Sequence, residues 1–197
     1  GMAATLVGAA LGAALECLEM AAGEDLGALT AAEPGDAGLW RPLGCGADWP
    51  NGGTSWVRAW VITAGAWASV PRDVLSTDFA VGAAAEAAPI LRVSIGLGAG
   101  ADLAAAMMHG LLEAIEGDAR IRAEATGRLV RIAVPDCTPV RLARAAGLRV
   151  ACWAMPCRAG LVAVRASVME VPGASALPLP AAGYAARFYG KAAVEAA

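Results

Sequence analysis

Hydrophobic and polar positions alternate along several short stretches of the chain, which is the pattern of half-buried β-strands. The stretch TSWVRAWVITA, for example, alternates and carries Trp, Val and Ile. Any strand pairing after this stretch should end at Pro71, because proline has no backbone N–H to donate. Strands are predicted at residues 54–64, 89–98, 128–134, 148–155 and 160–170.

Helical spacing and turn residues divide the rest of the chain. Gly23 should end an alanine-rich first helix, Asp102 can cap a long central helix, and Gly147 marks a turn after a short helix. Helices are predicted at residues 3–22, 102–125 and 138–146, and residues 187–197 are predicted to form the start of a last helix. Stretches rich in Gly, Pro, Asn and Asp predict loops at residues 23–53 and 171–180.

The order of these elements mixes helices with strands and predicts a fold of the α/β (mixed α+β) class. Helices in such folds are layered over a sheet, so that each element buries its apolar face against another. With 197 residues the chain is long enough to bury a substantial core as one domain. We therefore expect a single domain over residues 1–197.

Composition excludes several classes of protein. The formal net charge is −3 and Lys191 is the single lysine, so no nucleic-acid-binding surface is expected. The apolar run from Met2 to Leu15 has no basic residue before it and is followed by glutamates, unlike a signal peptide. No apolar run reaches the ~18–20 residues of a membrane span. We expect a cytoplasmic protein that binds neither nucleic acid nor membrane.

The cysteines predict no metal or disulfide framework. Five cysteines in a chain without a secretion signal are unlike a set of disulfides. Cys152 and Cys157 are spaced C-x4-C, with Cys137 upstream and His109 as the single histidine. A zinc site usually combines paired cysteines with further Cys or His ligands. Reduced, partly buried thiols are the better interpretation.

A Glu-x-x-Glu pattern recurs along the chain. GAALECLE and HGLLEAIE, residues 12–19 and 109–116, align without gaps at an offset of 97 residues. The final KAAVEAA resembles a third copy, with Glu195 at the position of the first glutamate. An internal repeat, in which the fold is duplicated in tandem, would explain the recurrence, although alanine-rich helices also match each other by chance.

Two such helices could bring four carboxylates together. Residues three apart share one face of a helix, and like charges there raise one another's pKa unless a cation lies between them. Mg²⁺ takes oxygen ligands, usually a few carboxylates together with substrate phosphates. The alternative is that these glutamates are solvated surface residues, which are common on helices.

The loop SIGLGAGAD lies between a predicted strand and a helix start. Backbone N–H groups at such a junction point outward and suit phosphate. Ser94, Gly96, Gly98 and Gly100 are therefore candidates for nucleotide binding, although neither the Walker lysine nor the G-x-G-x-x-G fingerprint is present. A tight turn explains the glycines equally well.

Together, SIGLGAGADLAAAMMHGLLEAIEGDA resembles the signature of the YcaO family, approximately S-N-G-L-A-A-G, a short helical lead and H-A-L-L-E-x-I-E-R-D-A. The matching residues are Ser94, Gly96, Leu97, Gly100, His109, Leu111, Leu112, Glu113, Ile115, Glu116, Asp118 and Ala119. WVRAWVITAGAWASVPRDVLSTD resembles the family's W-x-x-x-x-L-x-x-G followed by V-P. GAALECLEMAAGE resembles its S-A-x-x-E-x-x-E-R helix, and GYAARFYGKAAVEAA the segment leading to E-A-x-Q-x-R.

The resemblance implies a YcaO-like fold and an enzyme that uses ATP and Mg²⁺ to activate backbone amides of peptides. A nucleophile adds to the amide carbonyl, the oxyanion is phosphorylated, and phosphate leaves to give an azoline, thioamide or amidine. The implied ligands of the magnesium ions are Glu16, Glu19, Glu113 and Glu116, with Glu195 of the third copy as a further candidate. The implied partners are a peptide substrate or precursor peptide, a second YcaO-like or accessory chain, and a second copy in a homo-oligomer.

The sequence also departs from the family pattern. Met20 and Gly117 stand where the family has arginine after each Glu-x-x-Glu, and Gly12 and Ile95 replace its serine and asparagine. The family's segments before the first helix and after Ala197 are missing from this sequence. Each departure removes a polar or cationic group that could contact phosphate. Two functions stay open: an amide-activating enzyme, either alone or completed by a partner chain, and a degenerate relative that binds peptides or assembles complexes.

Overall fold

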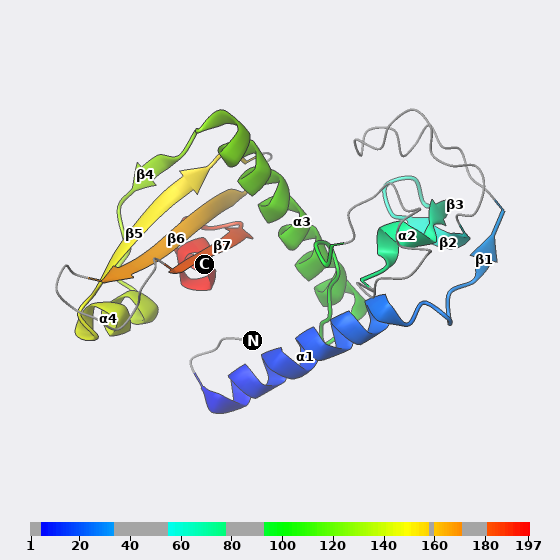
Figure 1. Ribbon diagram of the computed structural model, residues 1–197, viewed down its shortest axis with the longest axis horizontal. Coiled ribbons are helices and arrows are strands. Elements are labelled where there is room, and N and C mark those ends of the chain that lie inside the picture. Colours follow the sequence, from blue (N-terminus) through cyan, green and yellow to red (C-terminus); the bar gives the residue numbers. More distant parts are fainter. Residues whose placement is uncertain (1–4, 34–54, 78–92, 158–159, 171–180) are drawn as a thin grey trace. The chain divides into compact units, whose positions relative to one another are not determined.

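The computed structural model describes residues 5–33, 55–77, 93–157, 160–170 and 181–197 (Figure 1). The chain divides into two compact units, Gly1–Ser94 and Ile95–Ala197. Each unit combines helices with an antiparallel sheet. The expected mixed α+β class is therefore confirmed.

The first unit begins with the alanine-rich helix α1 (Leu6–Glu24), whose N-terminus is capped by Thr5. The Thr5 hydroxyl accepts a hydrogen bond from the Gly8 N–H at 3.1 Å. The expected end at Gly23 is wrong, because the helix continues through that residue to Glu24. Gly23 is buried and its carbonyl accepts from the Thr77 N–H at 2.9 Å, so this glycine serves close packing rather than termination.

A three-stranded antiparallel sheet completes the first unit. Its order is β1 (Ala31–Ala32), β2 (Trp56–Val61) and β3 (Ala66–Pro71), followed by the short helix α2 (Arg72–Leu75). Trp56, Val57 and Val70 are buried and form the core of this sheet. Pro71 is the last paired residue of β3, which confirms that strand pairing ends there.

Helix α1 is the one helix within the described ranges that has the length and apolar composition to cross a membrane. Core helices of soluble proteins and signal sequences meet the same two criteria, so the helix by itself assigns no membrane span.

The second unit begins with a glycine-rich loop and the long helix α3 (Leu103–Thr126). Asp102 caps this helix as expected, because its Oδ1 accepts from the Ala105 N–H at 2.8 Å. Gly127 ends it with a φ of 64°, a left-handed conformation that glycine adopts without strain.

A four-stranded antiparallel sheet forms the centre of the second unit (Figure 1). Its order is β4 (Val130–Ile132), β5 (Leu148–Met155), β6 (Val162–Glu170) and β7 (Ala181–Arg187). The short helix α4 (Thr138–Ala145) precedes β5, and α5 (Gly190–Ala196) follows β7. A turn at Gly147, with φ 76°, joins α4 to β5 as predicted.

Helices cover both faces of this sheet, which confirms the expected layering. On one face, Ala119 and Ala123 of α3 form a buried cluster with Met155, Ala163 and Ala186. On the other face, Cys152, Val164 and Ala166 pack against Ala193 and Val194 of α5. The small residues at these contacts allow the helices to approach the sheet closely.

The cysteines in the described part of the chain are free thiols, and Cys152 belongs to the second of these clusters. Cys17, Cys137, Cys152 and Cys157 carry no disulfide. Burial, together with the neighbouring Cys137 thiol, raises the pKa of the Cys152 thiol. Cys152 therefore stays protonated at neutral pH and acts as a small apolar side chain.

Two strand predictions are corrected by the structure. Residues 93–98 form no strand and belong to the glycine-rich loop, while residues 89–92 of that prediction lie outside the described residues. Strand β7 was not expected, because AAGYAAR has low strand propensity and is held by its pairing with β6. Most of the two predicted loops, residues 34–53 and 171–180, also lies outside the described residues. The internal repeat stays a prediction.

Candidate functional site

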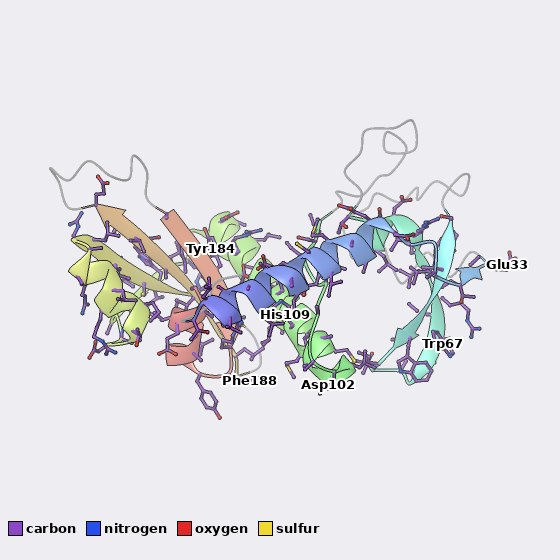
Figure 2. All side chains as sticks on the ribbon, turned by 90° about the horizontal axis from the view of Figure 1, so that it is seen from below. Glu33, Trp67, Asp102, His109, Tyr184 and Phe188 are labelled. Carbon is purple, nitrogen blue, oxygen red and sulfur yellow. The ribbon has the colours of Figure 1, made fainter. Side chains whose placement is uncertain are left out.

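The second Glu-x-x-Glu lies in the middle of α3, beside the glycine-rich loop that precedes the helix. Glu113 Oε2 accepts a hydrogen bond from the Gly96 N–H at 3.0 Å. Gly96 has a φ of 96°, which a residue with a side chain rarely adopts. The loop therefore holds one carboxylate of the pair through a backbone donor. Figure 2 labels Asp102 and His109, which mark the part of α3 that leads to this pair.

The glycines of the loop let its backbone lie directly on α3. A Cβ added to Gly98 would overlap the Ala106 carbonyl and lie 2.7 Å from the Gly110 N. A Cβ on Gly100 would lie 2.6 Å from the Ala106 N, and one on Gly110 would overlap the Gly96 carbonyl. Close packing of the loop on α3 therefore explains these glycines, and no bound ligand is needed to explain them. Nucleotide binding by Gly96, Gly98, Gly100 and Ser94 stays a prediction.

Burial and neighbouring charges both act on the pKa of Glu116, which lies on the same helix. Burial raises the pKa of its carboxyl group above the usual value, and the Glu113 carboxylate raises it further. The guanidinium groups of Arg120 and Arg187 act in the opposite direction and lower it. The net effect is a raised pKa, so the charged form of Glu116 is only partly compensated within the protein.

These two carboxylates fit a hard divalent cation. Mg²⁺ prefers oxygen ligands, and it usually takes one or two carboxylates from the protein together with substrate phosphates. A cation between Glu113 and Glu116 would remove their mutual repulsion and compensate the burial of Glu116. Within the described ranges, no group of three or more His, Cys, Asp or Glu side chains is assembled. The pair in α3 would thus supply part of a ligand set.

The raised pKa of Glu116 predicts that Glu116→Gln stabilises the metal-free chain at neutral pH. The folded chain binds this proton more readily than the unfolded chain, whose Glu116 titrates near 4.5. The contribution of the Glu116 proton to the stability of the fold is thus fully present below that pH. This contribution is lost as the pH rises through the raised pKa. Calorimetric melting in EDTA should show a higher Tm for the variant at pH 7.

The same comparison at pH 4 should show no such gain, because the wild-type carboxyl group is then largely protonated. Glu124→Gln is the matched control, since Glu124 is exposed on the same helix. A gain of equal size at both pH values would show that burial of the charge is not its cause.

The other predicted metal ligands lie elsewhere in the chain. Glu16 is exposed and Glu19 half-buried on α1, in the first unit. Glu195 is exposed on α5 of the second unit. Because the two Glu-x-x-Glu pairs belong to different units, their convergence on one site stays a prediction. Ser94 is half-buried and is the last residue of the first unit.

Two cations beside Glu116 were missed by sequence reasoning. Arg120 follows Glu116 by four residues, a spacing that places both on one face of a helix and that could have been noticed. Arg187 is the last residue of β7, and no local pattern connects it with α3. The chain therefore lacks the arginine at position 117 but has other arginines close to the pair.

Two of the departures from the expected pattern contact each other. Gly117 is buried, and a Cβ added there would lie 3.3 Å from two carbon atoms of the Ile95 side chain. Position 117 therefore packs against the apolar side chain at position 95. The two residues that replace the family's arginine and asparagine are therefore sterically compatible with each other.

Comparison with protein families gives a match over the whole sequence. A family model described as YcaO cyclodehydratase, ATP- and Mg²⁺-binding, matches residues 1–197. A search of curated protein sequences gave no match.

Solved structures of low sequence identity share the fold. The structure of YcaO from Methanopyrus kandleri bound with AMPPCP and Mg²⁺ is 23% identical, with a TM-score of 0.74, and the match covers 100% of this chain and 51% of that one. A heterocyclase in complex with substrate and cofactor is 18% identical, with a TM-score of 0.71 and coverage of 93% and 29%.

The E. coli microcin synthetase McbBCD complex is 16% identical over 73% of this chain and 38% of its own, with a TM-score of 0.61. The chain thus spans about half the length, or less, of the structures that it matches.

Proposed function

The chain belongs to the YcaO family, and from this premise we propose that it takes part in the ATP- and Mg²⁺-dependent activation of a peptide backbone amide. The observation that carries the proposal is the Glu113–Glu116 pair, in which the Gly96 N–H holds Glu113 and the charge of Glu116 is only partly compensated. The M. kandleri protein, bound with AMPPCP and Mg²⁺, supports the same choice of cofactors.

The proposed reaction is phosphorylation of the amide oxygen. A nucleophile adds to the carbonyl carbon of the peptide, and the resulting oxyanion takes the γ-phosphoryl group of ATP. Loss of phosphate then gives an azoline, thioamide or amidine, according to the nucleophile. Such a reaction depends mainly on positioning and on stabilisation of the charge on the phosphoryl group.

The residues of α3 have separate parts in this proposal. Glu113 and Glu116 would hold a magnesium ion, together with Glu16 and Glu19 if the two pairs converge. When bound, Mg²⁺ would neutralise charge on the phosphates. The Gly96 N–H orients the Glu113 carboxylate through the 3.0 Å hydrogen bond. Arg120 and Arg187 beside Glu116 limit the repulsion between the carboxylates and are further candidates to contact phosphate.

A degenerate relative that binds peptides or assembles complexes is the second candidate function. The contact between Ile95 and Gly117 favours it, since an apolar pair occupies positions where the family signature has asparagine and arginine. A complete enzyme could still arise with a partner chain or a second copy of this chain. The McbBCD structure is such a complex of several chains.

Titration of ATP in the presence and absence of Mg²⁺ distinguishes the two functions. We expect Mg²⁺-dependent binding with a Kd weaker than about 1 μM, corresponding to less than ~8 kcal/mol, because the chain lacks the Walker lysine and the signature arginines. Isothermal calorimetry with EDTA as the Mg²⁺-free reference measures it. Binding that is indifferent to Mg²⁺, or absent at millimolar ATP, would favour the degenerate relative.

A further inference from the structure

A row of cationic and aromatic side chains crosses the sheet of the second unit. Trp153 of β5, Arg165 of β6 and Tyr184 of β7 are direct cross-strand partners, and Arg131 of β4 lies opposite Trp153. Direct partners project from the same face of a sheet. This is the face whose far end is covered by α3, and Figure 2 labels Tyr184 within it.

The members of this row stack on one another. The Arg165 guanidinium lies 5.6 Å from the centroid of the Trp153 ring and 5.9 Å from that of Tyr184. The Arg120 guanidinium of α3 lies 5.5 Å from the Tyr184 ring on the same face. Contacts with two aromatic rings constrain the position of the Arg165 guanidinium on this face.

Two buried donors on this face have no hydrogen-bond partner within the described part of the chain. They are the Arg165 Nε and the hydroxyl of Ser167, a residue that is only 2% exposed. The two residues are separated by one position on β6, so both project from the same face. Buried donors are nearly always satisfied, because an unmade hydrogen bond is costly. A ligand could satisfy them only if the side chains that cover them moved aside.

The charged side chains that the described strands place on this face are all arginines. Arg131 of β4 and Arg149 of β5 are exposed, and no Asp or Glu occupies the described positions of the four strands on this face. Local sequence spacing does not reveal this set of arginines, because they are far apart in the sequence and only the strand register gathers them. Arginine forks bind carboxylates through paired hydrogen bonds.

We propose that this face, defined by Arg131, Arg149, Trp153, Arg165 and Ser167, binds an acidic peptide segment in extended conformation. Arg149 and Trp153 are four residues apart on β5, which is roughly 13 Å along a strand. That span is too long for one phosphate or carboxylate, and it suits acidic side chains at alternate positions of an extended peptide. The proposal goes beyond the reaction on α3, and its test needs neither ATP nor Mg²⁺.

The probe is a fluorescein-labelled peptide of eight residues in which Glu and Thr alternate, followed by fluorescence anisotropy. The wild-type chain should bind it, and a counterpart with Gln in place of Glu should bind at least ~10-fold more weakly, since it lacks the carboxylates that form the stronger, charge-assisted hydrogen bonds with arginine. Arg131→Gln with Arg149→Gln should also weaken binding by ~10-fold or more. Both residues are exposed, so the fold should persist, as circular dichroism can verify.

Arg144→Gln is the matched control, because Arg144 is an exposed arginine of α4 and lies outside this face. It should bind the acidic peptide as the wild type does. The proposal is overturned by an absence of binding, by equal binding of the Gln peptide, or by equal losses in the Arg144 variant and the double variant. Tighter binding of a labelled single-stranded DNA to the same face would assign it to nucleic acid instead of a peptide.

Discussion

Replacing both Glu113 and Glu116 with glutamine is expected to weaken Mg²⁺-dependent binding of ATP by about 100-fold or to abolish it. Glutamine keeps the shape of each side chain but removes the two charges that a hard cation requires. Loss of support for a metal ion typically costs ~10- to 100-fold in affinity, and both proposed ligands of this helix are lost together. Calorimetric titration with and without Mg²⁺ measures the effect.

Glu124→Gln provides the control for this prediction, because it removes one carboxylate from the same helix at an exposed position. Its ATP affinity should match that of the wild type. Unfolding would not explain a loss in the double variant, since Glu116→Gln is expected to stabilise the metal-free chain at neutral pH. Unchanged Mg²⁺-dependent affinity in the double variant would remove these glutamates from the site.

Gly110→Ala is expected to lower the free energy of unfolding by about 2–3 kcal/mol, the range of overpacking in a tightly packed site. The added methyl group would overlap the Gly96 carbonyl and lie 3.1 Å from the Leu97 carbonyl oxygen, both of which are backbone atoms. The loop must then move away from α3, and the Gly96 N–H would release Glu113. ATP affinity should therefore fall together with stability, as measured by urea unfolding.

Gly117→Ala is the matched variant in the same helix. Its added methyl group meets only the Ile95 side chain, at 3.3 Å, and alanine improves helix propensity by ~1 kcal/mol relative to glycine. The free energy of unfolding should therefore change by less than ~1 kcal/mol in either direction. Equal destabilisation by both substitutions would mean that the loop does not depend on close contact with the helix backbone.

Local patterns were sufficient to predict most elements of the fold. Asp102 and Gly147 were recognised because capping and turn formation depend on one residue and its immediate neighbours. Strand β7 was missed because alanine and glycine have little strand propensity, and only its partner β6 fixes its conformation. Residues 93–98 were taken for a strand because their apolar pattern does not reveal that the backbone at Gly96 and Gly98 must lie against α3.

Of the candidate site, only the carboxylate residues could be predicted from the sequence. The spacing of Glu113 and Glu116 placed both on one face of a helix, but the burial that raises the pKa of Glu116 depends on the packing of the whole second unit. Arg187 reaches the pair from a strand that was not predicted. The glycines were correctly identified as important, and their observed role is packing against the helix that carries the glutamates.

Ile95 and Gly117, which depart from the family signature, should be considered together. Read separately, each looks like the loss of a phosphate-binding group, whereas in the structure they form one apolar contact. Such a contact is apolar and restores no cation. Arg120 and Arg187 remain beside Glu116, so the pair of carboxylates is not isolated from positive charge.

The central claim is that Glu113 and Glu116 of α3 bind the metal ion. Anomalous diffraction from crystals of the full chain grown with Mn²⁺ and a non-hydrolysable ATP analogue tests it most directly, since Mn²⁺ takes the oxygen ligands of Mg²⁺ and can be located without ambiguity. We predict an anomalous peak bounded by the Glu113 and Glu116 carboxylates and by the phosphates. Manganese bound elsewhere, without either of these carboxylates, would contradict the claim.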